Sequence, residues 1–471
     1  MQGNQAKTLL AGAGFACFLA MNSFSLWGFT LLPQTTLGAE GVTWWSVPLA
    51  YSNALAFLLF ALGAYKAPAL FSRNPLFAAV ILIALALILL SGHLVLDAPL
   101  MLAVAGTCMG LGTTCCFFCW ARAFREDGIT AAKFEIVLGS VLSAVPFLAF
   151  LTLDPSALVF TLSLLAFCNL LALFFRGRID APEDTSIGNI EPLRSVLSRS
   201  WKAFLCIGMI GLMAPVIAAL TQEPLDAAGF TQQALMVHSE NICAAAILGI
   251  AWFGLKRKMD ISTSFTLLFP ILATALLLFS FIGENARIIV PYVGGVSFVV
   301  ISMVVTIESV SDSIERNTNL TVVYGLNAGL LYCANQAGAV LTDILGKNLL
   351  LEGTSIIGVM FALLYGCSIV LFFITRKSTH KNGARDGAGQ DEMPEIDTVD
   401  IACRELIEQH GFSERQAEVL TYLAHGYDIP TIAKKLFLSE NTVRTHAKKV
   451  YAALDVHSKQ EIIELVNAPR T

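Results

Sequence analysis

Stretches of about 20 mainly apolar residues recur along the first 375 residues, and short segments that carry most of the charges separate them. A helix needs about 20 such residues to cross roughly 30 Å of hydrocarbon. We therefore predict an all-α, polytopic membrane bundle with twelve spans. The predicted spans are 8–32, 42–64, 76–96, 98–121, 132–153, 155–175, 201–222, 235–255, 263–282, 286–307, 320–345 and 353–375.

Composition supports this prediction. Of 471 residues, 56% are hydrophobic and only 14% are charged, whereas soluble domains use about 25% charged residues. The apolar run from Thr8 to Leu32 is too long for the h-region of a signal peptide, which spans about 7–15 residues. We therefore expect an uncleaved first span and a chain that lies mostly in lipid.

The positive charges predict the orientation, because Lys and Arg accumulate in cytoplasmic loops. With the N-terminus inside, eighteen Lys and Arg residues fall on cytoplasmic segments, and only Arg287 and Lys347 fall on the opposite side. We expect a multi-pass protein of the bacterial cytoplasmic (plasma) membrane with both termini in the cytoplasm. The longest internal loop, 176–200, is polar and divides the spans into six plus six.

Residues 8–375 thus resemble the major facilitator superfamily in architecture, since that family has two six-helix halves. The loop between spans two and three departs from the family pattern Gly-x-x-x-Asp-x-x-Gly-Arg-Arg. Residues 63–73 read GAYKAPALFSR and contain neither the Asp nor the second Gly. The resemblance implies a transporter-like bundle, and the departure argues against conventional transport.

The character of the chain changes after the last span. Residues 376–404 are rich in Gly and charge and predict a flexible linker after the membrane domain 1–375. Residues 405–471 have ordinary charge content and predict four short helices. Their expected N-terminal caps are Ser413, which forms a capping box with Gln416, and Asp428, Ser439 and Ser458.

The second and third of these helices, joined by the turn at 437–439, predict a helix-turn-helix without a wing. The third helix has one apolar stripe, formed by Val443, Ala447, Val450 and Leu454. Its outer face would then show Asn441, Arg444, Thr445, Lys448 and Lys449. Long cationic side chains beside small polar ones suit the major groove of DNA. Charge alone also fits a solvated surface, because Lys and Arg balance Asp and Glu from residue 401 onward.

Residues 412–466 resemble the LuxR/NarL/GerE type of helix-turn-helix, with its spacing intact. The matching positions are Arg415, Glu418, Val419, Leu420, Leu423, Ala424, Gly426, Ile432, Ala433, Leu436, Ser439, Glu440, Thr442, Val443, Arg444, His446, Leu454, Val456, Ser458 and Glu461. Gln416, Pro430 and Lys459 depart from the pattern. The resemblance implies base contacts by Arg444, Thr445 and Lys448, phosphate contacts by Thr442 and Lys449, and a supporting role for His446. It also implies a homodimer on double-stranded DNA.

Polar residues inside the spans are the candidates for binding a small-molecule effector. The first group is Glu240 with His238 and Asn241, and the second is Asn335 with Gln336; Asn22 and Asn53 are further candidates. The alternative for each amide is a hydrogen bond that holds two helices together.

Cys108, Cys115 and Cys119 share one face of span four, with Cys116 beside them, and they suggest either a redox or metal site or simple packing of small side chains. No His or carboxylate in that span completes a ligand set, so we expect no metal, no cofactor and no catalytic residues. The sequence therefore predicts a membrane-integral transcriptional regulator rather than an enzyme. The alternative is a secondary transporter with a regulatory DNA-binding tail.

Overall fold

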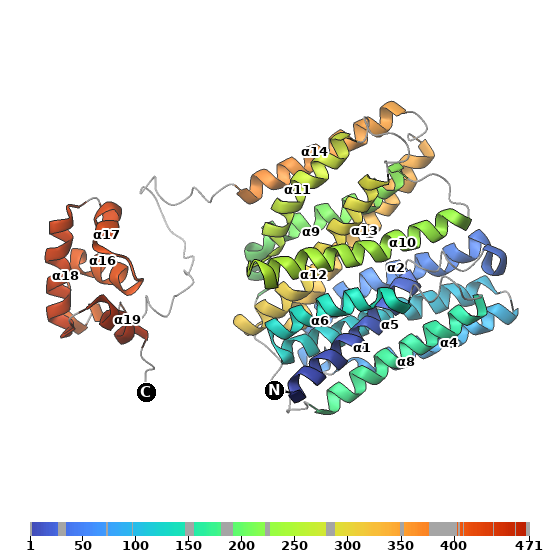
Figure 1. The fold of residues 1–471 in the computed structure, drawn as a ribbon, viewed down its shortest axis with the longest axis horizontal. Coiled ribbons are helices and arrows are strands. Elements are labelled where there is room, and N and C mark those ends of the chain that lie inside the picture. The colour runs from blue at the N-terminus through green and yellow to red at the C-terminus, as the bar shows by residue number, and fades with distance from the viewer. Residues whose placement is uncertain are drawn as a thin grey trace. The chain divides into compact units, whose positions relative to one another are not determined.

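A computed structural model gives the fold, and it describes residues 2–26, 34–71, 74–96, 98–146, 155–179, 192–221, 227–278, 288–348, 353–375, 403, 406–407, 409–436, 438–456 and 458–467. The chain divides into two compact units, Met1–Thr379 and His380–Thr471 (Figure 1). Each unit is described by itself.

Long helices make up the first unit, and each predicted span coincides with one of them. Their bounds are α1 Gln2–Leu26, α2 Gln34–Lys66, α4 Leu76–Leu96, α5 Pro99–Asp127, α6 Ile129–Leu142, α8 Pro155–Ile179, α9 Leu193–Thr221, α10 Ala227–Gly249, α11 Ile261–Leu278, α12 Ile289–Glu315, α13 Leu320–Asn348 and α14 Gly353–Thr375. A short helix, α3 Pro68–Phe71, follows α2, and one π-helical turn, Ile250–Gly254, extends α10.

Among the described residues, nine helices are long and apolar enough to cross a membrane. Shorter apolar stretches of α1 and α14 add to them, whereas α13 does not meet this criterion. The count of twelve spans therefore stays a prediction, but the multi-pass membrane character is clear. Large apolar side chains also cover the outside of the bundle, where lipid would solvate them; examples are Phe77, Ile88, Leu100, Phe160 and Phe361.

The bundle consists of two halves with the same internal packing, α1–α8 and α9–α14. In the first half α1 packs on α6 and α8, and α5 packs on α2 and α4. In the second half α9 packs on α13 and α14, and α12 packs on α10 and α11 in the same relation. The predicted division into six plus six thus corresponds to a structural repeat. We call the side on which α1 begins and α14 ends the linker face (Figure 1).

The halves meet along two helix pairs, α2 with α13 and α6 with α10. Glycines allow the backbones of the first pair to come close. A Cβ added to Gly325 would lie 2.7 Å from the carbonyl oxygen of Phe57, and one added to Gly329 would lie 2.8 Å from Cγ of Leu58. Small residues at crossings are how membrane helices gain van der Waals contact.

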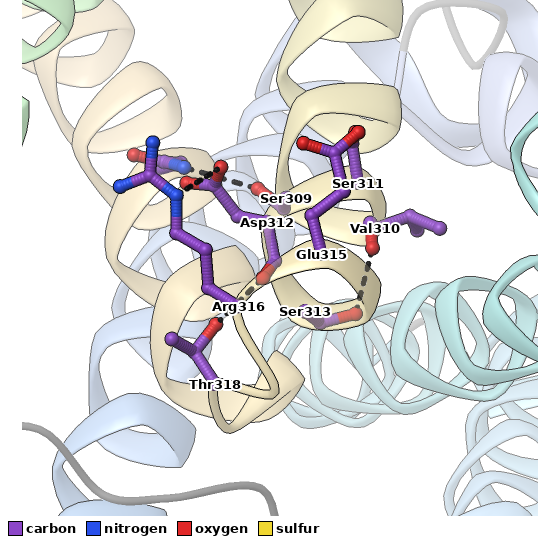
Figure 2. A network of polar contacts seen from close by, with 9 residues as sticks. Ser309, Val310, Ser311, Asp312, Ser313, Glu315, Arg316 and Thr318 are labelled. Atoms are coloured by element: carbon purple, nitrogen blue, oxygen red, sulfur yellow. Dashed lines mark hydrogen bonds and ion pairs between the residues drawn. The ribbon is translucent and has the colours of Figure 1, made fainter. Parts of the chain in front are cut away.

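Hydrogen bonds tie the turn between α12 and α13 on the linker face (Figure 2). The Arg316 guanidinium lies 3.6 Å from the Asp312 carboxylate, and the Thr318 hydroxyl donates to the carbonyl of Asp312. The Asn327 amide donates to the Ser309 hydroxyl at 3.0 Å and joins the two helices. These contacts fix the path of the chain from α12 into α13.

The second unit contains α16 Glu414–Ala424, α17 Ile429–Leu436, α18 Glu440–Leu454 and α19 Lys459–Asn467 around its own apolar core. Val419, Leu420, Ile432, Val443 and Ile462 are buried in it. Helical residues also precede α16, and Cys403 among them is buried in the same core. Cys403 falls within the predicted linker 376–404, so the folded domain includes residues before 405.

Candidate nucleic-acid interface and membrane cavity

Side chains cap the start of each helix of the C-terminal unit, where backbone N–H groups lack partners. Gln416 accepts the N–H of Ser413 at 2.8 Å, as the capping box requires. The side chains of Asp428, Ser439 and Ser458 accept the N–H groups of Thr431, Thr442 and Glu461 at 3.1, 3.2 and 3.2 Å. Gly426, at φ 84°, ends α16 in a conformation that favours glycine. These contacts fix where the four helices begin.

The cap of α17 makes the stability of this domain depend on pH. Hydrogen bonds from Thr431 lower the pKa of Asp428 below its ordinary value of 3.8. A carboxyl whose folded pKa is lowered stabilises the fold above its unfolded pKa, and this stabilisation is lost as the pH falls through the folded pKa. We expect Asp428→Ala to lower the thermal unfolding midpoint of the domain at pH 7, and the difference from the unchanged chain to narrow below pH 3.8.

Asp428→Asn is the matched control for this prediction, because it keeps a capping oxygen and removes the titration. Asp428→Asn and Asp428→Ala both lack the titrating carboxyl, so the unfolding midpoint of Asp428→Asn should lie above that of Asp428→Ala by an amount that does not change with pH. Circular dichroism at several pH values measures both variants. If the unfolding midpoint of Asp428→Ala lay below that of the unchanged chain by the same amount at every pH, this result would contradict the capping role.

One face of α18 is exposed and cationic. Val443, Ala447 and Val450 point into the core, and each is at most 1% exposed. Asn441, Arg444, Thr445, Lys448 and Lys449 are exposed, as the stripe on this helix predicted. This face consists of long donors with small polar residues between them, on the second helix of a helix-turn-helix.

Local contacts hold several of these side chains. The Arg444 guanidinium lies 3.3 Å from the Glu440 carboxylate one turn earlier, and both side chains remain more than half exposed. Thr445 donates to the Asn441 carbonyl at 2.9 Å, and the Thr442 hydroxyl lies 2.8 Å from that of Ser439. His446 is half-buried beside the core. Its position fits a packing role better than a surface contact.

In the membrane unit, a cavity of about 820 Å³ lies between the halves. Four helices of each half line it, namely α1, α2, α5 and α6 with α9, α10, α12 and α13. The lining runs from Thr43 near the start of α2 to Asn53 at its middle, and from Tyr332 to Asp343 on α13. Both stretches belong to the part of their helix farther from the linker face.

Six of the seven polar residues predicted to bind a ligand line this cavity: Glu240, Asn241, Asn335, Gln336, Asn22 and Asn53. His238 is buried on α10 but is not among the lining residues. Asn53 also joins two helices, because its amide donates to Thr113 and Thr114 of α5 at 3.1 and 2.9 Å. Asn53 therefore lines the cavity, where it could contact a ligand, and also joins two helices by hydrogen bonds.

Sequence reasoning missed the rest of the lining, which consists of aliphatic, aromatic and hydroxyl-bearing side chains together with Asp343. Phe117, Phe298 and Tyr332 supply apolar surface, and Ser140 and Ser302 supply hydroxyl groups. Asp343 was a charge within a predicted span and could have been singled out, but no charge or unusual residue type marked the other positions in the sequence. Only the packing of eight helices brings them together.

Aromatic rings close the cavity toward the linker face. Phe57 of α2 stacks on Tyr332 of α13 with ring centroids 5.4 Å apart and meets Tyr324 edge-on at 5.8 Å. Phe118 of α5 meets Tyr324 at 5.6 Å, and Phe117 lies 6.3 Å from Tyr332. We call these five residues the aromatic closure. It joins the two halves, since α2 and α5 belong to one half and α13 to the other.

A second cluster lies at the linker-face end of α8. Arg176 forms an ion pair with Asp127 at the end of α5, and its guanidinium lies 3.4 Å from the Glu135 carboxylate of α6. The sequence analysis did not single out Glu135, although a carboxylate inside a span was the available signal. This network joins three helices of the first half.

The cysteines of α5 are packed within the bundle. Cys116 accepts a hydrogen bond from Asn169 of α8 at 3.4 Å, and Cys119 donates to Asn74 at 3.2 Å. Within the described ranges, no group of three or more His, Cys, Asp or Glu side chains could hold a metal ion. These contacts favour packing, the second of the two alternatives for these cysteines.

Comparison with known proteins identifies the C-terminal unit. Residues 410–466 match the family model of bacterial regulatory proteins of the luxR family. Residues 410–466 are a LuxR-type helix-turn-helix domain. The oxygen regulatory protein NreC of Staphylococcus haemolyticus is 42% identical over 52 residues, and a putative transcriptional regulator of Pseudomonas aeruginosa is 42% identical over a stretch of the same length. These stretches are 11% of this chain and about a quarter of each relative, 24% and 25%.

The membrane unit has the fold of major facilitator superfamily transporters. A crystal structure of the Escherichia coli fucose:proton symporter FucP, determined on a single-residue variant, aligns over 79% of this chain and 98% of its own, with a TM-score of 0.53 and 13% identity. A second FucP structure, described as in the outward conformation, aligns with a TM-score of 0.51 and 13% identity over 79% of this chain and 99% of its own. The chain therefore fuses a LuxR-type helix-turn-helix domain to a transporter-like membrane domain.

Proposed function

We propose that the chain is a membrane-integral transcription regulator that binds double-stranded DNA through α18 and senses a small molecule in its membrane cavity. The observation that carries the proposal is the exposed face of α18, on which Arg444, Thr445 and Lys448 lie together. Arg and Lys side chains recognise guanine edges in the major groove, and exposed cations also bind phosphates. In this proposal Thr442, Lys449 and Asn441 contact the backbone or neighbouring bases.

The proposed input comes from the cavity between the halves. Its size falls within the range of small-molecule sites, about 300–1,000 Å³. A ligand that touches both halves binds one relative arrangement of them more tightly than another, and it shifts the equilibrium by that difference in affinity. We propose a homodimer on DNA and cytoplasmic termini, which place the DNA-binding domain beside the chromosome of a bacterium.

The proposal is tested with full-length chain in nanodiscs. Genomic fragments that the protein retains are sequenced, and binding of the enriched fragment is then measured at a fixed salt concentration, since phosphate contacts make affinity strongly dependent on salt. We expect one inverted-repeat site to bind at least a hundredfold more tightly than a scrambled fragment. Equal retention of all fragments would contradict a role as a sequence-specific regulator.

A secondary transporter with a regulatory DNA-binding tail is the second candidate, and the cavity between transporter-like halves is the observation that favours it. Uptake into proteoliposomes distinguishes the two. A ligand that stabilises the protein but does not accumulate in the vesicles supports sensing. Saturable uptake of that ligand supports transport.

A further inference from the structure

The carboxyl group of Glu240 has an unusual environment. Glu240 lies on α10, is 6% exposed, and lines the cavity. It is seated against the backbone of Gly295 on α12, where a Cβ would occupy the space of the carboxyl group. In the part of the chain that the structure describes, no hydrogen bond or ion pair engages this carboxyl group. A buried carboxylate without a partner is costly, and a cationic group that enters the cavity would remove this cost.

The hydrogen-bonding groups around the cavity indicate the chemistry of a ligand that would pair with Glu240. Three of the lining amides already donate within the protein. Asn335 donates to the Gly211 carbonyl at 3.5 Å, and Gln336 donates to the Asn335 oxygen at 3.4 Å. Asn53 likewise donates to Thr113 and Thr114. In contrast, Oδ1 of Asn22 is buried and accepts no hydrogen bond from any described residue. The Asn335, Gln336 and Asn53 amides are therefore engaged within the protein, whereas the cavity offers an unused buried acceptor in Asn22.

The charges of the lining residues also favour a ligand that donates hydrogen bonds. Glu240 and Asp343 are the ionisable carboxyl groups among the lining residues, and the described lining contains no Lys, Arg or His. An anionic ligand would be buried there without a counter-ion. A cationic ligand would pair with the Glu240 carboxylate, and a charge-assisted hydrogen bond of this kind is roughly twice as strong as a neutral one.

We propose that the cavity binds a small amine in its ammonium form, with the Glu240 carboxylate as counter-ion and the apolar body against Phe117, Phe298 and Tyr332. The proposal rests on the sensing function proposed above and specifies the ligand class for it. Aromatic faces suit both an apolar body and a nearby cation. Asn22, on the opposite half, offers a further acceptor in the same cavity.

The test uses full-length chain in nanodiscs and two families of probes. Hexylamine and benzylamine are each compared with the alcohol and the carboxylate of the same carbon skeleton. Binding is measured by isothermal calorimetry and by the shift of the unfolding midpoint of the membrane unit. We expect at least one amine to bind at least tenfold more tightly than its alcohol and its carboxylate.

Glu240→Gln keeps the shape and removes the charge, and it should lower the affinity for the amine at least tenfold. Glu315→Gln, the same change at an exposed position outside the cavity lining, should change it less than threefold. The preference for amine over alcohol in the unchanged chain does not depend on whether the variant folds.

Stabilisation by an alcohol or a carboxylate that persists in Glu240→Gln overturns the amine assignment and leaves sensing in place. Absence of binding by both amines also overturns it. Loss of sequence-specific DNA binding in the fragment experiment would instead contradict the proposed function, so the two failures are separate.

Discussion

Lys448→Ala is expected to lower the affinity of the full-length chain for its DNA site by roughly 5- to 150-fold. Lys448 is exposed on the same face of α18 as Arg444, and neither salt bridge nor hydrogen bond holds it among the described residues. A side chain that reads a base edge contributes about 1–3 kcal/mol of discrimination, and each 1.4 kcal/mol is about tenfold in affinity. The loss should be larger for the specific site than for scrambled DNA.

Lys449→Ala separates base reading from backbone contact. If Lys449 contacts phosphate, its removal should weaken specific and scrambled DNA alike, and should reduce the slope of log affinity against log salt by about 1. Fluorescence anisotropy at four or more salt concentrations measures both effects. Equal affinity of unchanged chain and Lys448→Ala at one salt concentration would refute the assignment of α18.

Glu440→Gln provides a control of opposite sign. Its carboxylate pairs with Arg444 in the free protein at 3.3 Å, and this pair has to open before Arg444 reaches DNA. Removing the charge also removes repulsion from phosphate, so affinity should rise a few-fold at low salt. Because the pair is exposed, it contributes little to stability, and the folded domain should tolerate the change.

The C-terminal domain shows how far local sequence signals can predict structure. Ser413, Asp428 and Ser439 were predicted as caps because their side chains act on N–H groups two or three residues away. The structure confirms the side-chain contacts of Asp428 and Ser439, and for Ser413 it shows the capping box with Gln416. The buried stripe of α18 followed from its 3.6-residue period, and its cationic face followed from that stripe. Such signals need no knowledge of the rest of the chain.

The membrane unit shows the opposite case. Its helices are apolar on the side facing lipid and on the side facing protein, so periodicity does not separate the two. Glu240 and Asn335 could be proposed as lining residues because they are polar within a span. The aromatic closure could not be predicted from the sequence, because Phe57, Tyr324 and Tyr332 resemble their apolar neighbours. The seat of Glu240 on Gly295 likewise depends on how α10 and α12 pack.

Gly329→Leu is expected to separate the halves on the linker face. Gly329 of α13 faces Leu58 of α2, where even a Cβ would lie 2.8 Å from Cγ of Leu58. A leucine cannot fit between these helices in the observed arrangement. Overpacking costs about 1–3 kcal/mol, which changes the ratio of two conformations by roughly 5- to 150-fold. The aromatic closure, next to this crossing, should open.

Cys333 reports on this separation. Its thiol lies at the same interface and donates to the carbonyl of Ala54 on α2 at 3.6 Å. When α2 and α13 part, water and maleimide reach this thiol, so its labelling rate should rise about tenfold, within the range given by the overpacking energy. Mass spectrometry of the labelled peptide distinguishes Cys333 from the other ten cysteines.

Gly358→Leu on α14 is the matched control, because a Cβ at Gly358 meets nothing within 4 Å. It makes the same substitution within a helix and should leave Cys333 labelling unchanged. If the cavity controls the DNA-binding domain through the relation of the halves, Gly329→Leu should also alter DNA binding without any ligand, and Gly358→Leu should not. Faster labelling with unchanged DNA binding would show that the closure moves independently of the helix-turn-helix domain, and would remove this route of coupling.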